Sequence, residues 1–134
     1  MTEENLKRLR EVYAEWAQGN FRAGGDLWAP DLVFDSVLET RATVVGPEAA
    51  ETYMREFLEQ WDEFSIAAER FEDLGETILV TEKQRGTGKT SRAVAELTAY
   101  AAWTFRGSEV THVHWNTSRG SALEAARQRG ERGK

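Results

Sequence analysis

The hydrophobic period changes from that of a helix to that of a strand within residues 46–68, which read GPEAAETYMREFLEQWDEFSIAA. Pro47 follows a glycine and precedes an acid, which is a favourable helix start. Apolar residues then recur three and four positions apart as far as Trp61, which predicts a helix over 47–60. From Phe64 onward apolar and polar residues alternate, which predicts a strand. A helix followed at once by a half-buried strand favours an α+β domain.

The segments on either side extend this pattern. Downstream we expect an antiparallel meander, because extended segments are joined by turns that contain glycine. These segments span 77–85, 91–105 and 110–117. Upstream, the spacing of Leu6, Leu9 and Tyr13 predicts a helix over 3–18. A short helix over 20–28 that Pro30 ends and a strand over 32–38 come next. Residues 121–127 are compatible with one more short helix. We therefore expect three helices in the N-terminal half to cover one sheet.

Length, charge and composition bound the class of protein. The chain has 134 residues, a net charge of −6 and no cysteine, which suits one domain without disulfides or thiol catalysis. An acidic chain lacks the basic footprint that nucleic acids require, so no nucleic-acid partner is expected. No apolar run is long enough for a membrane span, and we expect no signal peptide and a cytoplasmic location. We expect one domain over 1–126 and a basic, disordered tail over 127–134.

Five strings occur in a characteristic order: YAEWAQGNF at 13–21, LWAPDLVF at 27–34, GPEAA at 46–50, WTFRG at 103–107 and ALEAA at 122–126. Together they resemble the nuclear transport factor 2-like (NTF2-like) superfamily and, within it, the SnoaL-like and ketosteroid isomerase-like group. The resemblance implies a cone-shaped half-barrel, in which a curved antiparallel sheet and helices enclose a pocket, and a homodimer. This fold supports many activities and does not specify one.

The long strand predicts the floor of that pocket. Leu97, Ala99, Ala101 and Trp103 share one face, and the two alanines leave room between larger neighbours. We expect this face to point inward and to receive a small apolar or aromatic molecule without a cofactor. The expected pocket residues are Trp16, Trp28, Tyr53, Phe57, Trp61, Leu97, Ala101, Trp103, Val113 and Trp115.

Two residues are candidates for acid–base chemistry. Tyr13 resembles the oxyanion-stabilising tyrosine of the isomerase-like members, and a phenol in an apolar cavity can donate one strong hydrogen bond. Asp35 interrupts an apolar strand near the place of the family's general base. An ungapped comparison puts Ser36 there instead, and a shift of one residue reverses the face of a strand. Which of the two faces the pocket stays open.

Departures from the family pattern leave the activity open. The second oxyanion acid of the isomerases falls on Ala101, and residues 110–117 contain no counterpart of the cyclase acid. Two functions therefore remain. One is a ligand-binding domain that is also a cofactor-free acid–base enzyme of isomerase, cyclase or hydrolase type. The other is a non-catalytic binding or dimerisation module.

The opposite face of the long strand is nearly uncharged at its centre, which is typical of an interface. Residues expected at a two-fold homodimer interface are Thr98, Tyr100, Ala102, His112 and His114. The two histidines could supply two metal ligands, but a third is missing from the pattern, so no metal site is expected.

Overall fold

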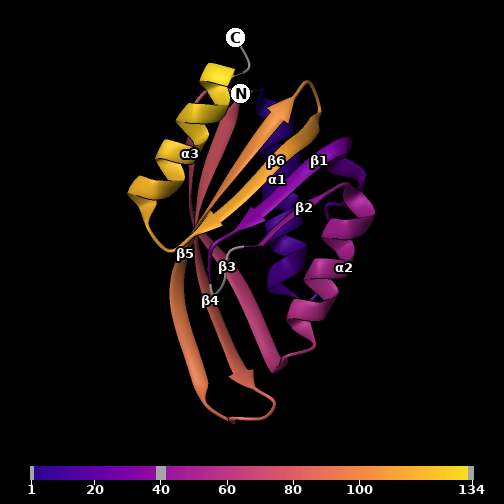
Figure 1. The fold of residues 1–134 in the computed structure, drawn as a ribbon, viewed down its shortest axis with the longest axis vertical. Coiled ribbons are helices and arrows are strands. Elements are labelled where there is room, and N and C mark those ends of the chain that lie inside the picture. The colour runs from indigo at the N-terminus through magenta and orange to yellow at the C-terminus, as the bar shows by residue number, and fades with distance from the viewer. Residues whose placement is uncertain (1, 39–41, 133–134) are drawn as a thin grey trace.

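The computed structural model describes residues 2–38 and 42–132, with side chains to residue 128. The helices are α1 (Glu3–Ala17), the 3₁₀ turn η1 (Gly25–Leu27), α2 (Pro47–Leu58) and α3 (Arg119–Arg132). The strands are β1 (Trp28–Ser36), β2 (Ala42–Val45), β3 (Trp61–Asp73), β4 (Thr77–Gly88), β5 (Val94–Arg106) and β6 (Glu109–Asn116). They form one curved sheet that does not close into a barrel, as Figure 1 shows.

The strands lie in the order β2-β1-β6-β5-β4-β3. The expected antiparallel meander is present as β3 to β6. The sheet is nevertheless mixed, because β1 pairs with β6 in parallel. β2 then turns back antiparallel to β1 and forms one edge of the sheet, and α2 connects it to β3 at the other edge. The α+β fold is confirmed, and the parallel pair is the departure from the expected topology.

The sequence between α1 and β1 differs from the expected short helix over 20–28. Only the single turn η1 forms there, because Gly24 adopts a positive φ of 101° that interrupts any helix. β1 begins at Trp28, earlier than predicted, and includes Pro30. The proline is tolerated because it lies where the pairing of β1 with β6 shifts register.

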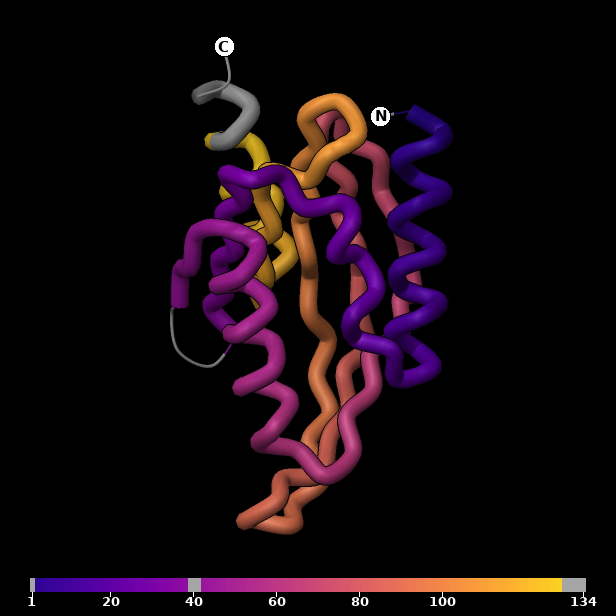
Figure 2. Tube along the Cα trace, turned by 90° about the vertical axis from the view of Figure 1, so that its right-hand side faces the viewer, coloured from indigo at the N-terminus to yellow at the C-terminus, as the bar shows by residue number. Residues whose placement is uncertain are grey.

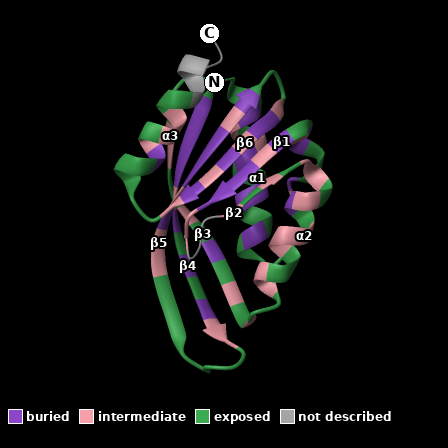
Figure 3. Cartoon of the chain, in the orientation of Figure 1, coloured by how far each residue is buried: buried purple, intermediate pink, exposed green. Residues whose placement is uncertain are grey.

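α1 and α3 lie on opposite sides of the sheet (Figure 2). The inner face, with Ile66, Val80, Ala101 and Trp103, packs against α1 and forms the main core. α3 covers part of the outer face through Ala122 and extends over part of the expected tail, to Arg132. Figure 3 shows that burial is concentrated where the helices cover the strands, whereas the hairpin end of β4 and β5 is exposed.

Gly86 on β4 provides a first test of this packing. The ring of Trp61 lies against its backbone, and a Cβ at Gly86 would lie 2.5 Å from Cε3 of Trp61. We expect Gly86→Ala to lower the free energy of unfolding by about 1–3 kcal/mol, since the indole must shift. Gly120→Ala is the matched control, because its Cβ would meet only the Ser118 hydroxyl at 3.9 Å. Equal urea midpoints for the two variants would contradict the close contact.

Candidate functional site

A carboxylate is buried at the centre of the inner face. Glu82 on β4 is 0% exposed and shares the inward face of its strand with Ile78 and Val80. Its Oε2 accepts a hydrogen bond from the hydroxyl of Tyr13 on α1. Tyr13 in turn accepts a 2.9 Å hydrogen bond from the indole nitrogen of Trp103 on β5. A helix and two strands therefore meet at one phenol–carboxylate pair.

The second oxygen of the same carboxylate is also occupied. Oε1 of Glu82 accepts hydrogen bonds from the indole nitrogen of Trp115 at 2.9 Å and from Nε2 of Gln84 at 2.8 Å. With the Tyr13 hydroxyl, three donors converge on Glu82. A carboxylate anion can accept all three hydrogen bonds. A protonated acid would add a fourth donor, for which these three partners offer no acceptor.

Burial determines the electrostatics of this pair. Removal from water raises the pKa of Glu82, and the hydrogen bonds from Tyr13, Gln84 and Trp115 partly oppose the effect. Burial, followed by the negative charge of Glu82, raises the pKa of Tyr13 well above its ordinary value. Tyr13 is therefore a neutral phenol at physiological pH, and its proton is committed to Glu82.

Two hollows adjoin this group on the inner side. The wide hollow, of about 660 Å³, is lined by aromatic residues that include Trp16, Trp28 and Phe34, with Arg55 and Glu59 among its charged residues. The narrow hollow, of about 160 Å³, is lined by residues that include Ser36, Gln84 and Trp115. Phe34 and Met54 belong to both walls. Glu82 and Tyr13 line neither hollow, but Glu82 accepts hydrogen bonds from Gln84 and Trp115 of the narrow hollow, and Tyr13 contacts Trp16 of the wide one.

The expected pocket residues are only partly in these walls. Trp16 and Trp28 line the wide hollow, and Tyr53, Phe57 and Trp115 line the narrow one. The remaining five are not among the lining residues: Trp61, Leu97, Ala101, Trp103 and Val113. Ala101 and Trp103 do point inward as expected, but other core side chains fill the space beside them. The small side chain at Ala101 therefore makes room for the core rather than for a pocket floor.

Asp35 does not face the inner hollows, so of the two residues that the sequence left open it is Ser36 that lies on the inner face. Phe34 and Ser36 line the narrow hollow, so Asp35 between them points to the outer face. There it contributes to a third hollow, of about 470 Å³, between the sheet and α3. Tyr13 and Asp35 consequently lie on opposite faces of the sheet and cannot act on the same molecule in the inner hollows.

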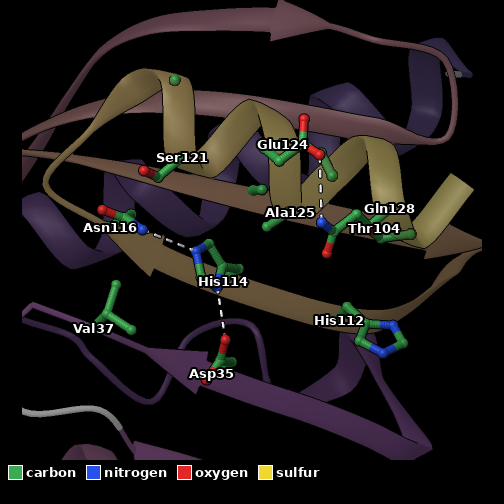
Figure 4. Close-up of a pocket in the computed structure, with 13 residues that line it drawn as sticks. Asp35, Val37, Thr104, His112, His114, Asn116, Ser121, Glu124, Ala125 and Gln128 are labelled. Carbon is green, nitrogen blue, oxygen red and sulfur yellow. Dashed lines mark hydrogen bonds and ion pairs between the residues drawn. The ribbon is translucent and has the colours of Figure 1, made fainter.

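Figure 4 shows how Asp35 and His114 point toward one another from β1 and β6. Oδ2 of Asp35 lies 2.8 Å from Nδ1 of His114, and Oδ1 accepts a 2.6 Å hydrogen bond from the Thr43 hydroxyl. Nε2 of His114 lies 3.3 Å from Nδ2 of Asn116, whose Oδ1 accepts from the backbone of Ser118. This chain places the ring proton of His114 on Nδ1 and leaves Nε2 as an acceptor.

α3 covers the centre of the expected dimer face. Ala102 is only 3% exposed in the single chain because Ala122 of α3 and Leu79 pack on it, and Tyr100 joins the same cluster. His112 and His114 line the outer hollow beside α3, whereas Thr98 lies beyond it and accepts a hydrogen bond from Lys83. The homodimer stays a prediction, and a second copy would have to contact α3 as well as the strands.

Sequence reasoning missed Glu82, although a signal was present. Positions 78, 80, 82 and 84 read Ile, Val, Glu and Gln, so a single acid occurs in a run of residues that share one face of the strand and are otherwise uncharged. An acid that faces the core needs buried hydrogen-bond donors. Here Tyr13, Trp103 and Trp115 surround it, and because they come from distant segments the local sequence does not reveal them.

Among residues 2–38 and 42–128, whose side chains the structure describes, no group of three His, Cys, Asp or Glu side chains could hold a metal ion. None of the helices in these ranges is long and apolar enough to cross a membrane.

Solved structures with the same fold are numerous. An NTF2-like protein of unknown function from Burkholderia pseudomallei K96243 superposes with a TM-score of 0.77 at 18% identity, over 92% of this chain and 97% of that one. A candidate SnoaL-like polyketide cyclase from Jannaschia sp. CCS1 gives a TM-score of 0.74 at 15% identity, covering 90% and 89% of the two chains. TerC, co-crystallised with polyporic acid, gives 0.72 at 14% identity, covering 90% and 95%.

Sequence comparison gives the family. No curated protein matches the chain significantly. The model of the SnoaL-like domain matches residues 9–113, a range that begins in α1 and ends in β6. It includes Tyr13, Glu82, Trp103 and, apart from Trp115, the residues that line both inner hollows. With most of its length matched and its α+β architecture in place, this chain belongs to the SnoaL-like domain family and has the NTF2-like fold.

Proposed function

We propose that this chain binds a small, largely apolar or aromatic molecule in the two inner hollows. The observation that carries the proposal is the pair of adjoining hollows, about 660 and 160 Å³, whose walls are mostly apolar, include aromatic side chains and share Phe34 and Met54. Ligand sites in proteins have volumes of about 300–1,000 Å³ and mostly apolar walls with a few polar groups. A cavity of roughly 150 Å³ holds a benzene-sized molecule, so the narrow hollow has room for one ring of a ligand that extends into the adjoining wide hollow.

The similar folds support a small-molecule ligand. TerC was co-crystallised with polyporic acid, and a ketosteroid isomerase-like protein from Catenulispora acidiphila was crystallised in complex with trimethylamine. The wide hollow also has charged lining residues, Arg22, Glu51 and Lys89 among them, which could contact a polar group of such a ligand.

Binding is favoured over acid–base catalysis in these hollows. An acid–base enzyme needs an ionisable group that reaches its substrate. The carboxylates that line the hollows, Glu51, Glu56 and Glu59, are exposed. The buried pair Tyr13 and Glu82 lines neither hollow, and its polar atoms already hold hydrogen bonds to each other and to Trp103, Gln84 and Trp115. We therefore assign this pair the role of holding the wall in place rather than of exchanging protons with the ligand.

Met54 gives the direct test, because it belongs to the walls of both hollows. We expect 1-naphthol, its methyl ether 1-methoxynaphthalene, or both to bind the wild-type chain in calorimetry. Met54→Trp should fill the space between the hollows and weaken binding tenfold or more, while circular dichroism stays unchanged.

Leu74→Trp is the matched control. It introduces the same indole at the exposed turn between β3 and β4, away from both hollows, and should leave the dissociation constant unchanged. Failure of both naphthalenes to bind the wild-type chain, or undiminished binding by Met54→Trp, would contradict the proposed site.

A further inference from the structure

We infer that the narrow hollow selects aromatic ligands that carry a hydroxyl group, because Gln84 presents a carbonyl oxygen there in an orientation that Glu82 fixes. The inference rests on the proposed function and specifies the class of ligand. Gln84 lies on the inner face of β4, is only 5% exposed and lines the hollow together with Ser36, Phe34 and Trp115.

The orientation of the Gln84 amide follows from its partner. Its Nε2 donates to Oε1 of Glu82 at 2.8 Å, and that carboxylate also accepts from Tyr13 and Trp115. If the amide turned over, its oxygen would face a carboxylate oxygen with no proton between them, which is an unfavourable pair of acceptors. The amide nitrogen is thus committed to Glu82, and the carbonyl oxygen is the polar atom left for the hollow.

A second polar group lies in the same wall. The hydroxyl of Ser36 on β1 is 3.4 Å from the backbone nitrogen of Leu38 and can both donate and accept. Around these two groups the hollow is lined by Phe34, Ile66 and Trp115. A hydroxyl on a bound ring can donate to the Gln84 oxygen, whereas a ligand without a donor covers that oxygen and leaves it unpaired.

A phenol fits this arrangement better than its methyl ether does. The two molecules share the same ring system, but only the phenol can donate a hydrogen bond. A buried acceptor left without its donor typically weakens binding by a factor of ten or more. We therefore expect the hollow to prefer 1-naphthol to 1-methoxynaphthalene by about tenfold or more at pH 7.5.

The test measures both ligands by calorimetry on the wild-type chain, Gln84→Met and Gln60→Met. Gln84→Met keeps the length of the side chain and removes the carbonyl oxygen. The ratio of the dissociation constants of 1-methoxynaphthalene and 1-naphthol should therefore fall to nearly one. Gln60 lines the same hollow but is exposed, and the same substitution there should leave the preference unchanged.

The outcomes separate this inference from the proposed function. Equal affinity of the wild-type chain for the two ligands would overturn the inference and leave the proposed binding site standing. This comparison uses the wild-type chain alone and so does not depend on the folding of Gln84→Met. A preference that survives in Gln84→Met would also overturn it. Failure of both ligands to bind the wild-type chain would overturn the proposed function, and the inference with it.

Discussion

Replacing Glu82 by leucine is expected to lower the free energy of unfolding by at least about 3 kcal/mol. The change leaves three buried donors without an acceptor: the Tyr13 hydroxyl, the Trp115 indole and the Gln84 amide. Each unsatisfied buried donor costs about 1–3 kcal/mol, and leucine recovers part of this sum by removing a buried charge. Urea unfolding followed by circular dichroism measures the loss.

Two matched variants isolate the cause. Glu82→Gln keeps the shape and an accepting oxygen, so its loss should be smaller, about 1–2 kcal/mol. Lys83→Leu makes the same kind of change at the next, outward and exposed position of β4 and should cost less than about 0.5 kcal/mol. A Glu82→Leu chain as stable as the wild type would contradict the role assigned to the buried carboxylate.

The difference in stability between wild type and Glu82→Gln should also depend on pH. Burial raises the pKa of Glu82 in the folded chain above its unfolded value. The folded state therefore binds the proton more readily, and stability from Glu82 is fully present below the unfolded pKa and is lost as pH rises through the folded pKa. We expect the advantage of wild type over Glu82→Gln to grow as pH falls from neutral toward the ordinary glutamate range. A difference that shrinks on acidification would contradict the raised pKa.

Ala102→Lys is expected to detach α3 from the sheet and to cost about 2 kcal/mol or more. Ala102 is buried beneath Ala122 and beside Leu79, so a lysine there must displace the helix or bury its charge. Hydrogen exchange should show faster exchange of the α3 amides while those of β3 and β4 stay protected.

Ala95→Lys is the matched control on the same strand, because Ala95 is exposed. It should leave both stability and α3 exchange unchanged. Unaltered protection of α3 in Ala102→Lys would mean that the helix does not depend on this contact. Sedimentation of the same variants tests the predicted homodimer, and a change in association for Ala102→Lys has to be interpreted together with the state of α3.

The sequence by itself determined the elements whose information is local. The three-and-four spacing of apolar residues is sufficient for α1 and α2, and the period of two is sufficient for the meander of β3 to β6. It also oriented β5 correctly, since Leu97, Ala99, Ala101 and Trp103 all belong to the main core. These properties depend on neighbours within a few positions, which is why a pattern in one chain predicts them.

Only the tertiary structure decided which residues form the site. The face that Asp35 takes depends on the pairing of β1 with β6, and a shift of one residue would have exchanged it with Ser36. Glu82 is tolerated in the core because Tyr13 from α1 and Trp115 from β6 reach its oxygens, and those segments are far apart in the chain. A buried charge is stable only where donors converge on it, and convergence of distant segments is a property of the fold rather than of any local pattern.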